Sequence, residues 1–178
     1  MKKLTMDALT RPSLIDFEKR EKLPVVLVLD NVRSALNVGS AFRTADGFAA
    51  QKIWLCGITA TPPSREIMKT ALGAAESVDW EHAENTAELL ARLSEGGWQV
   101  MAVEQTEPRT WLQDFEPKKG GKLALVFGNE VDGVSEAALA ECHGSLEIPQ
   151  AGTKHSFNIS VAIGIVLWEV FRKLNHQF

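Results

Sequence analysis

Short, continuously apolar runs alternate with helix-like segments along nearly the whole chain. The runs are too evenly apolar for strands wetted on one face, so they indicate a sheet covered by helices on both sides. Alternation of strands and helices predicts an α/β fold, a Rossmann-like and mostly parallel sheet. The expected strands are 24–30, 52–57, 98–104, 122–128 and 144–149, with 77–80 weaker, and the expected helices are 14–22, 38–48, 64–72, 87–94, 135–142 and 159–174.

Length and charge limit the classes of function. A chain of 178 residues is enough for one domain of ordinary size. Its formal net charge of -4 shows no global preference for nucleic acid, so RNA binding would need a local basic patch. Composition by itself favours an enzyme acting on a small molecule.

Metal, disulfide and membrane signals are weak. Cys56 and Cys142 are too few for a disulfide framework and lack the spacing of a zinc site, so both are predicted to be buried or idle thiols. The histidines show no ligand spacing, and we expect no metal. The start of the chain does not resemble a signal peptide, and the apolar stretch 159–168 is too short for a membrane span. We expect a cytoplasmic protein that does not bind membranes.

The segment LALVFGNEVDGVS, residues 123–135, outlines a phosphate-binding loop but lacks its chemistry. Val134 stands where the lysine of such a loop is required, and the Glu130 carboxylate would repel a phosphate. An NTPase is therefore disfavoured. The glycine fingerprint of dinucleotide-binding folds and the serine elbow of α/β-hydrolases are also absent from the sequence.

Two other strand ends carry unusual polar residues. The segment 29–48 contains Asn31, Arg33, Asn37 and Arg43, and Asn37 is predicted to cap a helix. The segment IPQAGTKHSFNIS, residues 148–160, leads into the last helix with Ser156, Asn158 and Ser160, more polar groups than one cap needs. Ligands of α/β folds bind beyond the carboxyl ends of strands, so these segments mark the expected site.

The last helix, 159–174, is apolar on almost every side. Positions that a solvated face would fill with charge hold Ser160, Gly164 and Trp168. A second subunit would cover such a helix. Burial within a single sheet is the alternative.

Together the segments NVRSALNVGSAFRTA, LVFGNEVDGVS and IPQAGTKHSFNIS resemble, in this order, the three signature motifs of the SpoU/TrmH branch of SPOUT RNA 2'-O-ribose methyltransferases. The similarity runs from about Leu23 to Leu174, so 1–22 is read as an N-terminal extension and 23–178 as the methyltransferase domain. The resemblance implies a C-terminal deep trefoil knot, S-adenosyl-L-methionine as cofactor, a homodimer, and tRNA or rRNA as the methylated partner.

The resemblance also implies roles for individual residues. The catalytic set would be Arg43, Asn37, Glu130, Ser156 and Asn158. The cofactor-binding set would be Gly128, Ile148, Pro149, Ser156, Phe157, Glu104 and Gln105. An arginine stays protonated, so Arg43 is expected to hold an RNA phosphate and the growing negative charge on the ribose oxygen rather than act as a literal base.

RNA contacts are expected from basic residues near the strand ends: Arg33, Arg43, Arg65, Lys69 and Lys154. The alternative from another class is a non-catalytic nucleotide-binding α/β module that uses the same loops. The joint presence of Arg43, Glu130, Ser156 and Asn158 argues against that module, because binding alone needs no group directed at the ribose.

Overall fold

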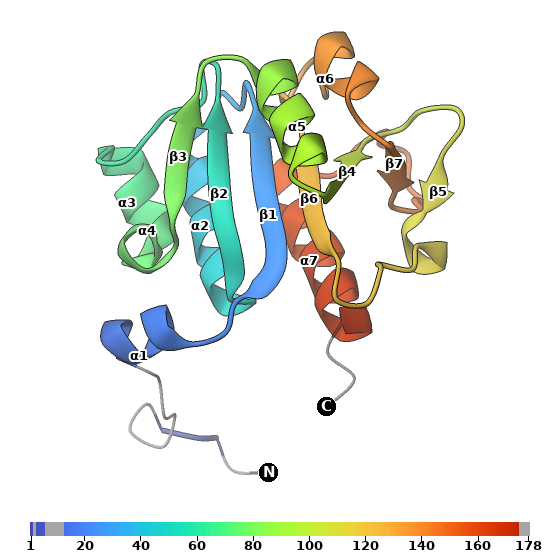
Figure 1. Cartoon of the computed structure of the whole chain (residues 1–178). Helices are drawn as coiled ribbons and strands as arrows, with labels where there is room; N and C mark the ends of the chain where they lie inside the picture. Colours follow the sequence, from blue (N-terminus) through green and yellow to red (C-terminus); the bar gives the residue numbers. More distant parts are fainter. Residues whose placement is uncertain (2, 6–12, 175–178) are drawn as a thin grey trace.

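The computed structural model describes residues 1, 3–5 and 13–174, and His176, one of the histidines for which no ligand role is expected, lies outside them. Seven parallel strands form one sheet in the order β3-β2-β1-β6-β4-β7-β5 (Figure 1). Their bounds are β1 Leu23–Asp30, β2 Ala50–Cys56, β3 Trp80–Ala83, β4 Trp98–Val103, β5 Thr110–Trp111, β6 Lys122–Phe127 and β7 Gly144–Glu147. The predicted α/β sheet is confirmed, and each of these pairings is parallel.

Helices cover both faces of the sheet, as predicted. They are α1 Leu14–Lys19, α2 Ala35–Gly47, α3 Arg65–Ala71, α4 Ala74–Ser77, α5 Thr86–Glu95, α6 Glu136–Ala140 and α7 Ile159–Leu174, with a 3-10 turn, η2, at Leu112–Asp114. One core lies under α2, α3, α4 and α7, and a second lies under α5 and α6. Alternate residues of β1 enter the two cores, which explains why the strand is apolar throughout.

Several boundaries differ from the prediction for local reasons. Helix α2 begins at Ala35 because Ser34 is its N-cap and accepts a 3.3 Å hydrogen bond from the backbone N–H of Asn37. The prediction that Asn37 is the cap was wrong. The expected helix 64–72 ends at Ala71, where Leu72 and Gly73 take positive φ values of 50° and 93°. The weak strand lies at 80–83 rather than 77–80, because 74–77 is helical.

The strand order brings together, at the carboxyl edge of the sheet, loops that leave it on opposite faces. β1 and β6 are neighbours, yet the chain leaves β1 toward α2 on one face and leaves β6 toward α6 on the other. Loops that diverge in this way leave room for a ligand beyond the carboxyl ends of the strands. The ends of β4, β6 and β7 lie side by side at that edge.

Helix α7 packs against α2 on one face of the sheet (Figure 1). Ile163, Val166 and Val170 are fully buried, while Val161 and Trp168 are 48% and 53% exposed. Trp168 joins Phe48 and Phe171 in an aromatic cluster at the end of α2. Burial within one sheet therefore covers only part of this apolar helix. Within the described ranges, no helix has the length and apolar character needed to cross a membrane.

Candidate active site at the ends of β4, β6 and β7

A cavity of about 500 Å³ lies where β4, β6 and β7 end. That volume is within the usual range of small-molecule sites. Three loops surround it: residues 104–105 after β4, residues 128–133 after β6, and residues 148–158 between β7 and α7. Apolar side chains from the strand ends and from α7 form its remaining wall: Val103, Phe127, Leu146, Ile159 and Ala162.

Asn129 builds the loop after β6. Its backbone N–H and C=O pair with those of Gly133 at 2.8 and 3.0 Å, and its side-chain oxygen accepts the N–H groups of Val131 and Asp132. Its side-chain amide donates to the backbone oxygen of Asn31 at the end of β1 over 2.8 Å. The motif predicted the loop but not the part of Asn129, which organises it from inside.

Gly128 is required by the loop's own backbone. A Cβ at this position would lie 2.0 Å from the carbonyl carbon of Gly133 and 2.1 Å from the backbone nitrogen of Val134. The family resemblance predicted that Gly128 lies in close contact with a cofactor. The structure gives a different reason for the glycine, because the returning strand of the loop occupies the space of a side chain.

Glu130 joins this loop to the first turn of α2. Its carboxylate accepts the backbone N–H groups of Arg33 and Ser34 at 3.0 and 3.1 Å and the side-chain amide of Asn37 at 2.9 Å. Partial burial opposes the charge, but hydrogen bonds from Arg33, Asn37 and Ser34 outweigh it and lower the pKa of Glu130 below its ordinary value. A carboxylate at a helix N-terminus is also favoured by the helix dipole.

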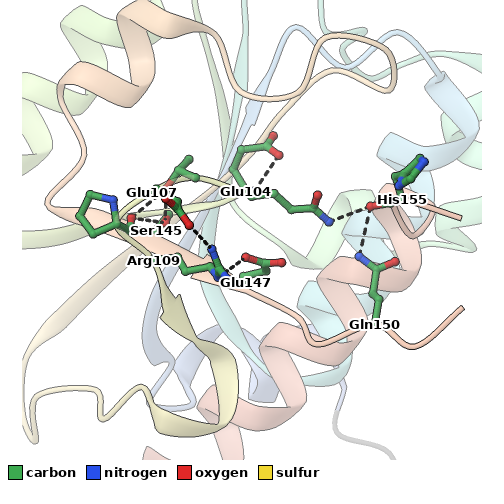
Figure 2. A network of polar contacts seen from close by, with 10 residues as sticks. Glu104, Glu107, Arg109, Ser145, Glu147, Gln150 and His155 are labelled. Carbon is green, nitrogen blue, oxygen red and sulfur yellow. Dashed lines mark hydrogen bonds and ion pairs between the residues drawn. The ribbon is translucent and has the colours of Figure 1, made fainter.

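Two carboxylates from adjacent strands face the cavity. Glu104, after β4, accepts the backbone N–H groups of Gln105 at 2.8 Å and Val134 at 3.1 Å. Glu147, at the end of β7, pairs with Arg109 at 2.8 Å (Figure 2). Neither lysine nor arginine is found among the described residues that line the cavity. The lining is therefore suited to a ligand with a cationic centre rather than to a phosphate.

The loop before α7 ends in a helix cap. The side-chain oxygen of Asn158 accepts the backbone N–H of Ser160 at 2.9 Å and its hydroxyl at 2.6 Å. Both bonds lie at the start of α7, and the roles of Ser156 and Asn158 at the ribose stay predictions. Ser156 and Phe157 line the cavity, and Phe157 is 41% exposed.

The structure brings most of the predicted site together. Of the predicted cofactor-binding residues, six line the cavity and Pro149 does not: the six are Glu104, Gln105, Gly128, Ile148, Ser156 and Phe157. Of the predicted catalytic residues, Glu130, Ser156 and Asn158 line it, and Asn37 reaches it through its bond to Glu130. Arg43 is exposed on α2 and is not part of the lining.

The predicted RNA-binding residues Arg33, Arg43, Arg65, Lys69 and Lys154 are all exposed, and none lines the cavity. Arg33 lies 3.9 Å from Asp132 of the loop after β6, which places one basic side chain beside the cavity mouth. The others lie on α2, on α3 and in the loop before α7.

Asp30 is a buried residue that sequence reasoning missed. Its carboxylate accepts bonds from the Thr86 hydroxyl at 2.5 Å, the Asn31 side chain at 2.8 Å and the Ser135 backbone N–H at 2.8 Å. It therefore ties the end of β1 to the end of the loop after β6. Only its place as the last residue of a buried strand, followed by an asparagine, could have indicated this.

The cysteines take no part in the cavity. Burial raises the pKa of Cys56 to about 12 and that of Cys142 to about 11, so both stay protonated and unreactive near neutral pH. Both are free thiols, as predicted. Within the described part of the chain, His, Cys, Asp and Glu side chains form no group of three that could hold a metal ion.

Comparisons with known proteins agree with this geometry. Residues 24–168 match the model of the SpoU rRNA Methylase family. The chain is 33% identical over 167 residues to the 23S rRNA (guanosine-2'-O-)-methyltransferase RlmB of Vibrio cholerae, covering 93% of this chain and 66% of that protein. A related protein from Ralstonia nicotianae is 32% identical, with 84% and 59% covered. The chain thus spans less than two thirds of the length of these curated relatives.

Solved structures of RNA methyltransferases are also similar to this chain. An AdoMet-bound rRNA methyltransferase from Sinorhizobium meliloti superposes with a TM-score of 0.80 at 29% identity, covering 89% of this chain and 60% of that one. A structure described under 2-OH methylation of C/U34 on tRNA has a TM-score of 0.76 at 26% identity, covering 87% of this chain and 100% of that one.

Proposed function

Because this chain belongs to the SpoU rRNA methylase family, we propose that it transfers the methyl group of S-adenosyl-L-methionine to a ribose 2'-hydroxyl in structured RNA, either tRNA or rRNA. The methyltransferase domain is proposed to span residues 23–178, with 1–22 as an extension. The observation that carries the proposal is that six of the seven residues expected to hold the cofactor line one and the same cavity.

The cavity has the chemistry that this cofactor requires. Apolar walls from Phe127, Ile148 and Phe157 suit an adenine ring. The Glu104 carboxylate gives a field that favours a cation, whereas the charge of Glu147 is offset by its ion pair with Arg109. When bound, the cofactor supplies an electrophilic methyl group and leaves as a neutral thioether. The protein's task is then to bind, orient and exclude water.

Each residue of the proposed site has a limited duty. Glu130 and Asn37 fix the start of α2 against the cavity mouth. Ser156 and Asn158 line the cavity beside Phe157 and would orient the ribose. Arg43 would hold the adjoining RNA phosphate and stabilise negative charge on the 2'-oxygen, because its guanidinium keeps its proton and offers a planar pair of donors.

RNA would approach over α2 and α3. Arg43, Arg65 and Lys69 are exposed on these two helices, which pack together, and Arg33 lies beside the cavity mouth. Such a local patch can supply phosphate contacts even though the chain carries a net charge of -4. The same proposal places the protein in the cytoplasm, together with its RNA substrate.

A homodimer is part of the proposal. The exposed Val161 and Trp168 on α7, with Leu36 on the neighbouring helix α2, leave apolar surface on one face of the protomer. Gly164 lies between the first two, and a Cβ there would meet nothing within 4 Å. This face is where a second copy would pack, in agreement with the helix pattern in the sequence.

A trefoil knot in the C-terminal part is also proposed. β7 pairs with β4, beyond β6, while α7 returns to pack on α2. Residues 148–158 therefore carry the chain back across the region of the cavity, as the threading of a knot requires. Pulling the chain from residues 13 and 174 in a force experiment should give a stretched length shorter than its full contour if the knot is present.

The function is tested by transfer of a labelled methyl group to RNA. Total RNA from a strain that lacks this protein should accept label on a ribose 2'-oxygen, and mapping the nucleotide would identify the substrate. Calorimetry should detect binding of S-adenosylhomocysteine and not of ATP. Binding of ATP in its place would overturn the proposal, and cofactor binding without transfer to any RNA would favour the non-catalytic module.

A further inference from the structure

The loop between β7 and α7 is exposed at every residue from Pro149 to Asn158. Among the hydrogen bonds of the described residues, one alone joins 149–157 to the rest of the fold. In it the side-chain amide of Gln105 donates to the backbone oxygen of His155 over 2.7 Å. Gln150, inside the loop, donates to the same oxygen over 3.3 Å (Figure 2). The next residue after this held carbonyl is Ser156.

Gln105 is itself held in place. It follows Glu104 at the end of β4, and its backbone N–H donates to the Glu104 carboxylate over 2.8 Å. The same carboxylate accepts the backbone N–H of Val134 over 3.1 Å. Through Glu104 and Gln105, the three loops around the cavity are therefore linked in one chain of hydrogen bonds. Its last member is the bond to His155.

We infer that Gln105 is a positioning residue, which holds the carbonyl of His155 and so places Ser156 and Phe157 against the cavity. Its side-chain donor is directed at this carbonyl, a different duty from the direct cofactor contact expected from the sequence. A nine-residue exposed segment fixed only at its ends samples many conformations, and one further fixed point inside it, two residues before Phe157, removes many of them. The consequence for cofactor binding rests on the proposed function.

The expected effect is moderate because the bond is exposed to water. A hydrogen bond of this kind changes an equilibrium by roughly a factor of ten. Gln105→Ala removes the donor. Gln105→Glu keeps the size of the side chain but directs a carboxylate at a carbonyl oxygen, so both variants should release the loop to a similar degree.

The loop itself can be tested without any ligand, by proteolysis of the native protein. Trypsin can cleave after Lys154, next to the held carbonyl, and cleavage needs the local chain to open. Both variants should raise the cleavage rate at this bond by about five- to tenfold, measured by mass spectrometry of the fragments. Gln51→Ala, a change of an exposed glutamine on β2, is the matched control and should cleave at the wild-type rate.

Binding of S-adenosylhomocysteine gives the second measurement. Both Gln105 variants should bind it about tenfold more weakly, while their thermal midpoints stay within about 2 °C of wild type. If both variants were cleaved after Lys154 at the wild-type rate, the inference would be overturned. It would also be overturned if their thermal midpoints fell and cleavage became faster at all sites, because general destabilisation would then explain the result. If the variants were cleaved faster but the wild-type protein bound no S-adenosylhomocysteine, the positioning role of Gln105 would stand and the proposed function would be overturned.

Discussion

The Glu130 carboxylate accepts a 2.9 Å hydrogen bond from the side-chain amide of Asn37. The two residues lie 93 positions apart in the chain, one in the loop after β6 and the other in the first turn of α2. Their bond joins the cavity to the helix that presents Arg43. At a rise of 1.5 Å per residue, the six residues from Asn37 to Arg43 span about 9 Å along α2.

Glu130→Gln should weaken this junction. A glutamine places an NH₂ group where the carboxylate now accepts N–H groups, so at least one of the bonds to Arg33 and Ser34 is lost. We expect the free energy of unfolding, measured with urea at pH 7, to fall by up to about 1 kcal/mol. Asp132→Asn, in the same loop, should change it much less, because the ion pair that Asp132 makes with Arg33 is exposed and 3.9 Å long. An equal fall in the free energy of unfolding in both variants would argue against a stabilising role for the bonds between Glu130 and the start of α2.

The same carboxylate predicts a pH dependence. The pKa of Glu130 is lower in the folded protein than its ordinary value, so its stabilisation is fully present above the unfolded pKa of about 4.3 and is lost as the pH falls through the folded pKa. The difference in stability between wild type and Glu130→Gln should therefore shrink as the pH falls from about 5. Unfolding curves measured at several acidic pH values would check this, and a constant difference would contradict it.

The layers of the fold could be predicted because each buried strand is apolar along its length. β1, for example, supplies alternate residues to two cores. The junctions could not be predicted in the same way. Glu130 and Asn37 are far apart in sequence, and the bond between them depends on β6 lying beside β1, which no local pattern encodes. The assignment of the cap to Asn37 failed for a local reason, since Ser34 three residues earlier offers an equally good acceptor.

Gly128→Ala should destabilise the fold as well as the site. Its Cβ would overlap the backbone of Gly133 and Val134, so the loop after β6 and the end of that strand must shift. We expect a loss of about 2 kcal/mol or more in the free energy of unfolding. Gly152→Ala is the control, because a Cβ there meets nothing within 4 Å. Wild-type stability in Gly128→Ala would mean that the loop does not close as described.

The shape of the site shows a similar limit to sequence reasoning. Two of the three motif segments supply loops to the cavity, whereas the segment 29–48 supplies no lining residue and residues 104–105 lie outside the motifs. Six of the seven residues predicted to hold the cofactor line the cavity. Pro149 was predicted to bind the cofactor but does not line the cavity, because a residue between two lining residues can still face solvent. The positioning role of Gln105 depends on the backbone carbonyl of His155, 50 residues later. Every residue has such a carbonyl, so the sequence does not indicate which one accepts the bond.

Gly164→Glu should separate the proposed dimer. The substitution has room within the protomer, since a Cβ meets nothing within 4 Å, so the fold should persist. In an interface, an unpaired carboxylate would lose its water at a high cost. Light scattering at micromolar concentration should give twice 19.6 kDa for wild type and close to 19.6 kDa for the variant. Ala91→Glu on α5, across the sheet, should leave the dimer intact, and a monomeric wild type would refute the interface.

Arg43→Lys tests the residue assigned nearest to the chemistry. Lysine keeps the positive charge but loses the planar pair of donors, so a site that depends on two-point contact should lose most of its rate, whereas one that needs only positive potential should not. We expect the single-turnover rate of methyl transfer to fall at least about a hundredfold, the scale for loss of one transition-state donor. Affinity for S-adenosylhomocysteine should hardly change, because Arg43 does not line the cavity. Arg92→Lys, an exposed change on α5, is the control and should keep its rate. Near-normal turnover in Arg43→Lys would reduce this arginine to a surface residue of α2 and move the catalytic assignment to Glu130, Ser156 or Asn158.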